Sequence, residues 1–400
     1  MLTSLALIFL VGLAMAAICQ RLKLPRIIGM LITGIVLGPY VLDFLDPSIL
    51  AISADLRKMA LIIILLKAGL SLDLGDLKKV GRPAVLMACV PASFEILAFF
   101  IFAPILLGVN HVEALVMGAV LGAVSPAVVV PRMVQLIEGK YGTEKSIPQM
   151  ILAGASCDDI FVIVLFTTFV SMAQGGTAEI SAFLDVPVSI ILGVFLGAVT
   201  GWFLSLFFER MYEHHCYVRN STKVILVLGI SFILVAIETW LECKVAISGL
   251  LAVVAMACML KIKCVPSVTK RLSEKFGKLW IAAEVILFVL VGAAVDISYT
   301  AEAGIAAVFM IFLALSVRAL GVVLCMLGTQ LNWKERMFCV IAYLPKATVQ
   351  AAIGSVPLSL GLPCGKMVLS VAVLAILITA PLGAIGMDAA YKKLITKEGK

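Results

Sequence analysis

The amino-acid sequence predicts an all-α polytopic membrane protein of about 13 transmembrane helices. We expect a 6+1+6 inverted-topology repeat with two broken crossing helices. Three observations predict this fold class. Of the 400 residues, 62% are hydrophobic and only 14% are charged, unlike a soluble domain. Apolar stretches of membrane-spanning length recur along the chain, and three patterns of the first half reappear in order in the second.

Hydrophobic runs define the predicted spans. They lie near 2–19, 27–44, 58–71, 84–108, 112–136, 148–172, 186–208, 221–241, 245–260, 279–297, 301–328, 336–358 and 366–388. The first run is followed rather than preceded by its charges, so we expect a retained helix and not a signal peptide. The longest polar interval, 261–278, is too short for a soluble domain, and we expect a loop there.

Basic residues predict the orientation. Lys and Arg concentrate in the loops after odd-numbered spans, and the loops after even-numbered spans are nearly free of them. Because basic residues gather in cytoplasmic loops, we expect an outside N-terminus and a cytoplasmic C-terminus. The location that we expect is the cell membrane. The net charge of +7 has the same explanation, so we expect no nucleic-acid partner. The ten cysteines include no CxxC pair, and we expect neither disulfides nor a bound cofactor.

An internal repeat organises the chain. Three pairs of segments match at offsets of 219 to 223 residues: 27–38 with 247–258, 65–73 with 288–296, and 122–131 with 341–350. Since seven spans separate equivalent helices, the second copy enters the membrane in the opposite direction, as in many secondary transporters. We therefore expect a first repeat over 1–185, a linking helix and loop over 186–220, and a second repeat over 221–400.

The third pair places proline in the middle of a span in both halves. Pro126 and Pro345 each remove a backbone hydrogen bond from their helix. Freed backbone groups at membrane depth survive only inside protein or beside a water-filled cavity, so paired broken helices indicate a binding site. Ser125 and Thr348 supply hydroxyl groups there, either to bind a cation or to cap freed backbone.

Two adjacent acids, Asp158 and Asp159, lie near the middle of the predicted span 148–172. A charge at that depth costs at least about 2.5–3.5 kcal/mol, so such residues indicate function. Neighbouring residues on a helix point about 100° apart, so one carboxylate can face a basic partner while the other faces a cavity. A carboxylate in such a site can exchange a proton for a small hard cation, which prefers oxygen ligands.

Three other charges lie inside predicted spans. Lys346 follows the second proline, Arg318 lies within 301–328, and Glu95 lies within 84–108. These charges can balance the aspartates, and Arg318 with Glu95 can equally form a purely structural ion pair. The sequence leaves the pairing open. His214 and His215 lie in a basic loop without a second group of metal ligands, so pH sensing fits them better than metal binding, and we expect no metal beyond the transported cation.

Taken together, these segments resemble the monovalent cation/proton antiporter superfamily, and in particular its two-aspartate sodium/proton antiporters of the NHA type. The segments are 25-PRIIGMLITGIVLGP-39, 67-KAGLSLD-73, 121-LGAVSPAVVVPRM-133, 154-GASCDDI-160 and 343-YLPKATVQAAIG-354. The resemblance implies a sodium/proton antiporter fold, and a homodimer whose dimerisation and core subdomains interleave the repeats. It implies electrogenic exchange of Na⁺ or Li⁺ for protons by an elevator-type movement, and a role in pH homeostasis.

The resemblance also implies roles for single residues. Asp159 is then the main carrier of cation and proton, with Asp158 beside it. Lys346 becomes a candidate partner of Asp158, and Arg318 of Glu95. Where other two-aspartate members have lysine, Arg318 cannot readily release a proton, so a lysine-release mechanism does not fit this position.

Other functions stay open at this point. A sodium-coupled organic-anion symporter uses the same scaffold, and a potassium/proton antiporter or a channel also fits a polytopic protein. An intramembrane protease fits poorly, because its two carboxylates must face each other across a water and adjacent residues of one helix cannot. We therefore expect no enzymatic activity.

Overall fold

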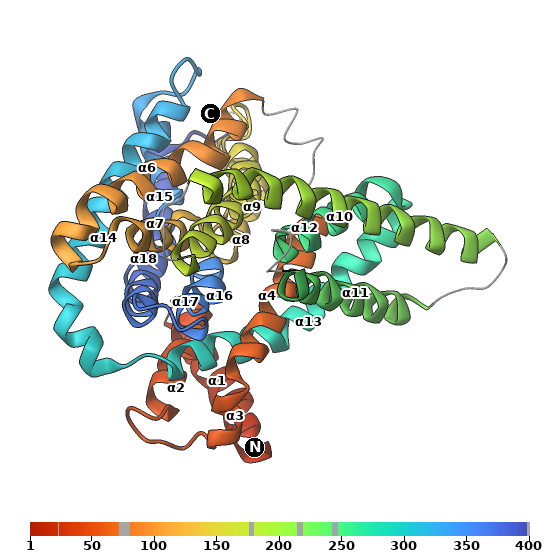
Figure 1. Cartoon of the computed structure of the whole chain (residues 1–400). Helices are drawn as coiled ribbons and strands as arrows, with labels where there is room; N and C mark the ends of the chain where they lie inside the picture. The colour runs from red at the N-terminus through yellow and green to blue at the C-terminus, as the bar shows by residue number, and fades with distance from the viewer. Residues whose placement is uncertain (23, 72–80, 176–179, 214–218, 242–246, 398–400) are drawn as a thin grey trace. The chain divides into compact units, whose positions relative to one another are not determined.

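The computed structural model describes the chain except residues 23, 72–80, 176–179, 214–218, 242–246 and 398–400 (Figure 1). The described residues are helical apart from connecting segments and one isolated bridge between Tyr141 and Lys397. The all-α prediction is confirmed. His214 and His215 lie outside the described residues, as does part of the repeated segment 65–73.

The chain divides into two compact units, of which unit 1 comprises residues 1–54, 73–173 and 285–400. Its helices are α1 (Leu2–Arg21), α2 (Arg26–Leu37), α3 (Pro47–Ala51), α6 (Arg82–Leu107), α7 (His111–Gly122), α8 (Pro126–Glu138), α9 (Ile147–Gln174), α14 (Ile297–Cys325), α15 (Trp333–Ala342), α16 (Thr348–Gly354), α17 (Val356–Ser359) and α18 (Gly365–Leu394). All residues of the candidate site belong to this unit.

Unit 2 comprises residues 55–72 and 174–284. It contains almost all of α4 (Ser53–Ser71), together with α10 (Ile180–Glu213), α11 (Asn220–Leu241) and α12 (Gly249–Lys263). The division falls within α13 (Pro266–Ala293), between Glu284 and Val285.

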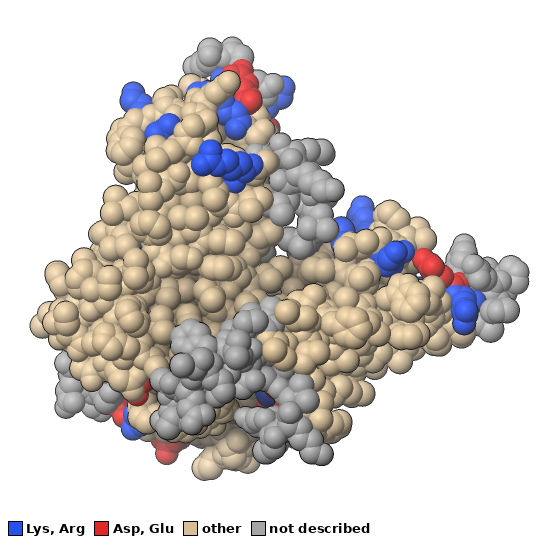
Figure 2. Space-filling model, turned by 45° about the horizontal axis from the view of Figure 1, so that its top comes forward, with Lys and Arg blue, Asp and Glu red and all other residues tan. Residues whose placement is uncertain are grey.

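Among the described residues, eight helices are long and apolar enough to cross a membrane. They are α1, α6, α9, α13 and α18, the 191–211 part of α10, the 220–238 part of α11 and the 304–325 part of α14. Large apolar side chains are exposed on them, for example Ile105 (78%) and Leu320 (61%), and water does not favour so much apolar surface. Figure 2 shows that charged side chains are sparse on the visible face. The chain is an integral multi-pass membrane protein.

The polar interval 261–278 is not the predicted loop. Helix α13 begins at Pro266 and continues without a break into the apolar run that ends at Ala293. Proline is favoured in the first turn of a helix. The pairs Lys270–Glu274 and Glu274–Lys278 have the i,i+4 spacing at which opposite charges stabilise a helix. The polar segment is therefore an extension of the helix.

Glycines bring α10 and α12 of unit 2 into backbone contact. Gly193, Gly197 and Gly201 lie four residues apart and so share one face of α10. A Cβ atom at Gly197 would lie 2.1 Å from the carbonyl oxygen of Ala252 on α12. Membrane helices commonly associate through such small-residue faces, because close backbone approach replaces the missing hydrophobic driving force.

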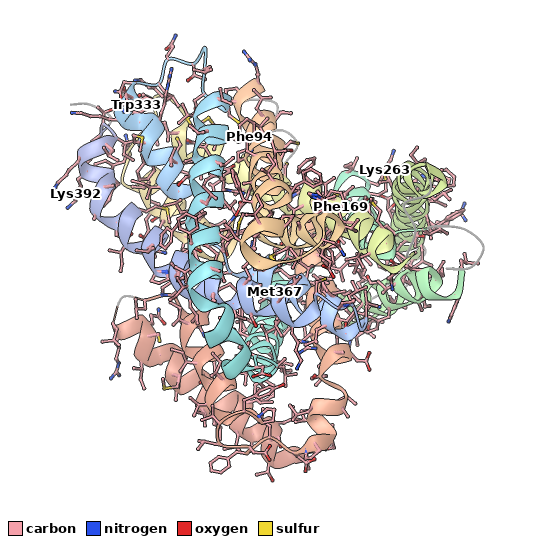
Figure 3. The ribbon with its side chains drawn as sticks, turned by 60° about the vertical axis from the view of Figure 1, so that its left-hand side comes forward. Phe94, Phe169, Lys263, Trp333, Met367 and Lys392 are labelled. Carbon is pink, nitrogen blue, oxygen red and sulfur yellow. The ribbon has the colours of Figure 1, made fainter. Side chains whose placement is uncertain are left out.

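The loop 139–146 connects α8 to α9 and is held on two flanks. Gly142 donates its backbone N–H to the carbonyl oxygen of Thr396 (2.8 Å), beside the bridge between Tyr141 and Lys397. On the other flank, Lys145 Nζ lies 2.8 Å from Glu335 Oε2, at the start of α15. Figure 3 shows Trp333, the first residue of α15, and Lys392, near the end of α18, at the same end of unit 1. The loop thus links α8 and α9 to the start of α15 and to the segment that follows α18.

Candidate functional site

Two helices of unit 1 are interrupted where the sequence predicts it. The predicted span 112–136 consists of α7, an extended segment at 123–125 and α8, which begins at Pro126. The predicted span 336–358 likewise contains two helices. The first, α15, ends at Ala342, the second, α16, begins at Thr348, and Pro345 lies in the break between them. Proline cannot donate a backbone hydrogen bond and disfavours the helical conformation of the preceding residue.

The two breaks lie against each other. Ser125 donates its backbone N–H to the carbonyl oxygen of Pro345 at 2.8 Å. Gln350, fully buried on α16, donates from Nε2 to the carbonyl oxygen of Ala123 and accepts from the backbone N–H of Ala347, both at 2.8 Å. Segments more than 200 residues apart are therefore joined through backbone groups that the breaks release from helical pairing. Gln350 was not among the site residues predicted from the sequence, although an amide side chain five residues after Pro345 was the available signal.

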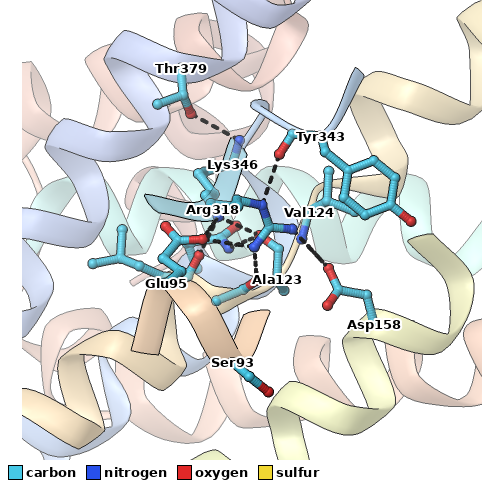
Figure 4. A network of polar contacts seen from close by, with 12 residues as sticks. Ser93, Glu95, Ala123, Val124, Asp158, Arg318, Tyr343, Lys346 and Thr379 are labelled. Carbon is cyan, nitrogen blue, oxygen red and sulfur yellow. Dashed lines mark hydrogen bonds and ion pairs between the residues drawn. The ribbon is translucent and has the colours of Figure 1, made fainter. Parts of the chain in front are cut away.

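A buried ion network lies beside the breaks (Figure 4). Glu95 of α6 accepts from Lys346 Nζ at 2.6 Å and from Arg318 Nη1 at 2.7 Å, both on its Oε2 atom. The side chains of all three residues are at most 2% exposed. Buried charges are tolerated only when they are paired and hydrogen-bonded, and these three satisfy one another.

The two cations also bind carbonyl groups that the breaks leave free. Lys346 Nζ donates to the carbonyl oxygens of Leu121 (2.5 Å) and Ala123 (3.2 Å). Arg318 donates from Nη1 to the carbonyl oxygen of Gly122 and from Nε to that of Tyr343 (3.0 Å). Because the C-terminal ends of α7 and α15 carry partial negative charge, the cations stabilise both interrupted ends.

The two aspartates of α9 differ in their partners. Asp158 is fully buried, and its Oδ2 accepts from the backbone N–H of Val124 (2.8 Å) and from Arg318 Nη2 (3.2 Å). Asp159 is 7% exposed, and its Oδ1 has no hydrogen-bond partner among the described residues. If all are ionised, Glu95 and Asp158 balance the two cations and leave Asp159 as an uncompensated carboxylate.

Several buried oxygens near the breaks are unpaired within the described part of the chain. They are Asp158 Oδ1, Asp159 Oδ1, Ser125 Oγ, Thr348 Oγ1 and the hydroxyl of Tyr343. Buried polar groups are nearly always paired, so a group of unpaired ones indicates a site that exchanges ligands. Carboxylate and hydroxyl oxygens are hard ligands, suited to hard cations rather than to soft metals.

The structure thus answers the pairing question. Arg318 contacts Glu95, as expected, and it also binds Asp158. Lys346 pairs with Glu95 rather than with Asp158, because its ammonium group points at the α7 end of the first break, where the carbonyl oxygens of Leu121 and Ala123 lie. Asp158, the two cations, Glu95 and both breaks come from distant parts of the sequence and meet in unit 1 (Figure 4).

Comparison with known proteins gives consistent matches. The profile of the family "Sodium/hydrogen exchanger, transmembrane" matches residues 5–390. The chain is 35% identical to the sodium/hydrogen exchanger 9B2 of Mus musculus over 90% of the chain and 67% of that protein. It is 33% identical to the sodium/hydrogen exchanger 9B1 of Homo sapiens, over 94% of the chain and 73% of that protein.

A solved structure shares the fold. The sodium proton antiporter MjNhaP1 from Methanocaldococcus jannaschii, at pH 8, superposes with a TM-score of 0.84 and covers 98% of both chains. The two sequences are only 20% identical, so this likeness concerns the arrangement of the helices.

Proposed function

Because the chain belongs to the sodium/hydrogen exchanger family, we propose that it is a secondary active antiporter that exchanges Na⁺ or Li⁺ for protons. Family membership confirms the resemblance noted in the sequence and makes the protein a transporter rather than an enzyme. The observation that carries the proposal is the difference between the two aspartates. Asp158 is held by Arg318 and Val124, whereas Asp159 has a buried carboxylate oxygen with no hydrogen-bond partner among the described residues.

In this mechanism, a cation and protons compete for Asp159 and Asp158. A bound cation or proton neutralises Asp159, the carboxylate that the fixed cations leave uncompensated, and so lowers the cost of carrying the site across the membrane. Ser125 and Thr348 supply hydroxyl oxygens as further cation ligands, and their unpaired oxygens support that role. Lys346, Arg318 and Glu95 keep the breaks and Asp158 in place while Asp159 exchanges its ion.

Alternating access follows from the proposed architecture. We propose 13 spans in a 6+1+6 inverted repeat, divided at 185 and 220, with the N-terminus outside and the C-terminus in the cytoplasm. The breaks around Pro126 and Pro345, 219 residues apart, support the repeat. We further propose that the protein is a homodimer in the cell membrane, in which the core subdomain of each protomer moves like an elevator against the dimerisation subdomain.

Purified protein in proteoliposomes tests the function. A Na⁺ gradient should drive proton movement, and Asp159→Asn should abolish it, because an amide cannot exchange a proton for a cation. Asp43→Asn is the matched control, since Asp43 is exposed and its positive φ suits asparagine equally well. Full exchange by Asp159→Asn would show that the carrier is another group.

Current measurements on supported membranes test the stoichiometry. Electrogenic exchange, the expected mode, gives a transient current on Na⁺ or Li⁺ concentration jumps and requires that Asp158 also take up a proton. Exchange without current would assign one-for-one transport, with Asp158 permanently paired to Arg318. A response to K⁺ alone would indicate a potassium/proton antiporter. Na⁺-driven uptake of an organic anion without proton movement would indicate a symporter, and ion flux that is not coupled to protons would indicate a channel.

A further inference from the structure

Tyr343 contacts the ion network through two parts of its structure, its backbone carbonyl group and its ring. It follows α15 directly, and its side chain is almost fully buried. Its carbonyl oxygen accepts from Arg318 Nε at 3.0 Å, and the guanidinium carbon lies 5.6 Å from its ring centre. The ring and the carbonyl therefore hold Arg318, but the hydroxyl contributes to neither contact.

The hydroxyl of Tyr343 reaches α9. It is buried and has no hydrogen-bond partner among the residues that the structure describes. A Cβ atom at Gly154 would lie only 2.2 Å from this hydroxyl oxygen, so the helix admits the tyrosine because position 154 is glycine. A buried, unpaired hydroxyl destabilises a protein, and phenylalanine would fill nearly the same space without that cost. The hydroxyl thus serves something other than packing.

Helix geometry indicates an acceptor for this hydroxyl on α9. Asp158 lies four residues after Gly154, so the two share one face of α9 about 6 Å apart along its axis. Side chains on a helix lean towards its N-terminus, which directs the Asp158 carboxylate back towards Gly154 and the tyrosine hydroxyl. Figure 4 shows Tyr343 and Asp158 on the same side of Arg318. The second carboxylate oxygen of Asp158, Oδ1, likewise has no hydrogen-bond partner in the described part of the chain.

We propose that Tyr343 is a positioning residue of the ion site, whose hydroxyl donates to Oδ1 of Asp158 when the site holds its cation. Arg318 and Val124 already bind Oδ2, so this bond fixes the remaining freedom of the carboxylate. Asp158 then keeps one orientation while the neighbouring Asp159 exchanges ions. The inference rests on the proposed cation/proton exchange and adds a residue to it.

Tyr343→Phe tests this role, because it removes the hydroxyl and keeps the ring and the carbonyl. In proteoliposomes we expect the KM for Na⁺ to rise about tenfold, the effect of losing one hydrogen bond to a charged group, with the maximum rate within about twofold. The melting temperature without Na⁺ should stay equal or rise. A merely structural tyrosine would instead lower the melting temperature and the maximum rate. Tyr40→Phe, at an exposed position, is the matched control.

Gly154→Ala provides a second variant that keeps Tyr343. Its methyl group would displace the hydroxyl, so this variant should have a higher KM for Na⁺, as in Tyr343→Phe, and a lower folding yield. Adding Tyr343→Phe to Gly154→Ala removes the clash and should restore the folding yield, but not the KM. An unchanged KM in Tyr343→Phe, with exchange intact in the wild type, would overturn this inference alone. A wild type with neither exchange nor Na⁺-dependent thermal stabilisation would overturn the proposed function, and this inference with it.

Discussion

Glu95 Oε2 lies 2.6 Å from Lys346 Nζ and 2.7 Å from Arg318 Nη1, so one carboxylate oxygen pairs with two buried cations at once. Each cation in turn holds carbonyl groups at the end of a broken helix. The charge on Glu95 therefore supports both breaks, although Glu95 lies on neither broken helix.

Glu95→Gln should be strongly destabilising. The amide keeps the shape but leaves Lys346 and Arg318 without a shared counter-charge, and breaking a buried ion pair in this way costs about 3–5 kcal/mol. We expect a much lower melting temperature in detergent, measured by size-exclusion chromatography after heating. Glu144→Gln, an exposed acid in the loop 139–146, should leave the melting temperature unchanged. Equal stability of the two variants would contradict the central role of Glu95.

Arg318→Lys should not preserve the network. Arg318 uses Nε, Nη1 and Nη2 to contact both Glu95 and Asp158 and two carbonyl groups, and a single ammonium group cannot reach them all. Loss of one charge-assisted bond should lower the free energy of unfolding by about 1.5–3 kcal/mol. Chemical unfolding monitored by tryptophan fluorescence measures this change. A lysine variant with wild-type stability and transport would mean that the planar guanidinium is not needed.

Gln350→Met should loosen the junction of the two breaks. The backbone N–H of Ala347 then loses its acceptor, whereas the carbonyl oxygen of Ala123 keeps Lys346. An unpaired buried group costs about 1–3 kcal/mol, so amide hydrogen exchange should accelerate around 345–350. Gln350→Glu should be worse, because it aims a carboxylate oxygen at the carbonyl of Ala123. Unaltered exchange rates in Gln350→Met would argue against a joined pair of breaks.

Gly197→Ala should disrupt α10 against α12. The new Cβ would lie 2.1 Å from the carbonyl oxygen of Ala252, a contact that backbone movement alone can relieve. Overpacking of this kind costs about 1–3 kcal/mol, so the folded yield and melting temperature should fall. Gly229→Ala on α11 is the control, since nothing lies within 4 Å of its added Cβ and alanine favours helix. Similar losses in both variants would point to a general effect of glycine replacement.

The positions of the two breaks, and most of the charged residues that lie beside them, were predictable from the sequence. Pro126 and Pro345 mark the breaks because proline acts on its own helix, and Asp158 and Glu95 stand out because a charge in an apolar run is costly. Such local signals require no knowledge of neighbours.

The pairing within the site was not predictable. Lys346 lies 251 residues from its partner Glu95, and no local pattern specifies which carboxylate a buried ammonium group meets. Gln350 and Tyr343 were missed because a neutral amide or phenol group inside an apolar span is much less costly than a charge. Such residues therefore do not stand out in the sequence. The polar start of α13 was wrongly predicted to be a loop. Hydropathy identifies the apolar part of a helix that lies in the membrane, but not a polar extension of the same helix beyond it.

The long separations in the ion network have a consequence for biosynthesis. Glu95 and Asp158 are translated 223 and 160 residues before Arg318. At about 5–20 residues per second, α6 waits roughly 11 to 45 s for the guanidinium that neutralises its carboxylate. During that time the nascent first half holds unpaired acids, which an insertion machinery must shelter from lipid or accept in protonated form. The site is therefore assembled only when α14 and the second break emerge from the ribosome.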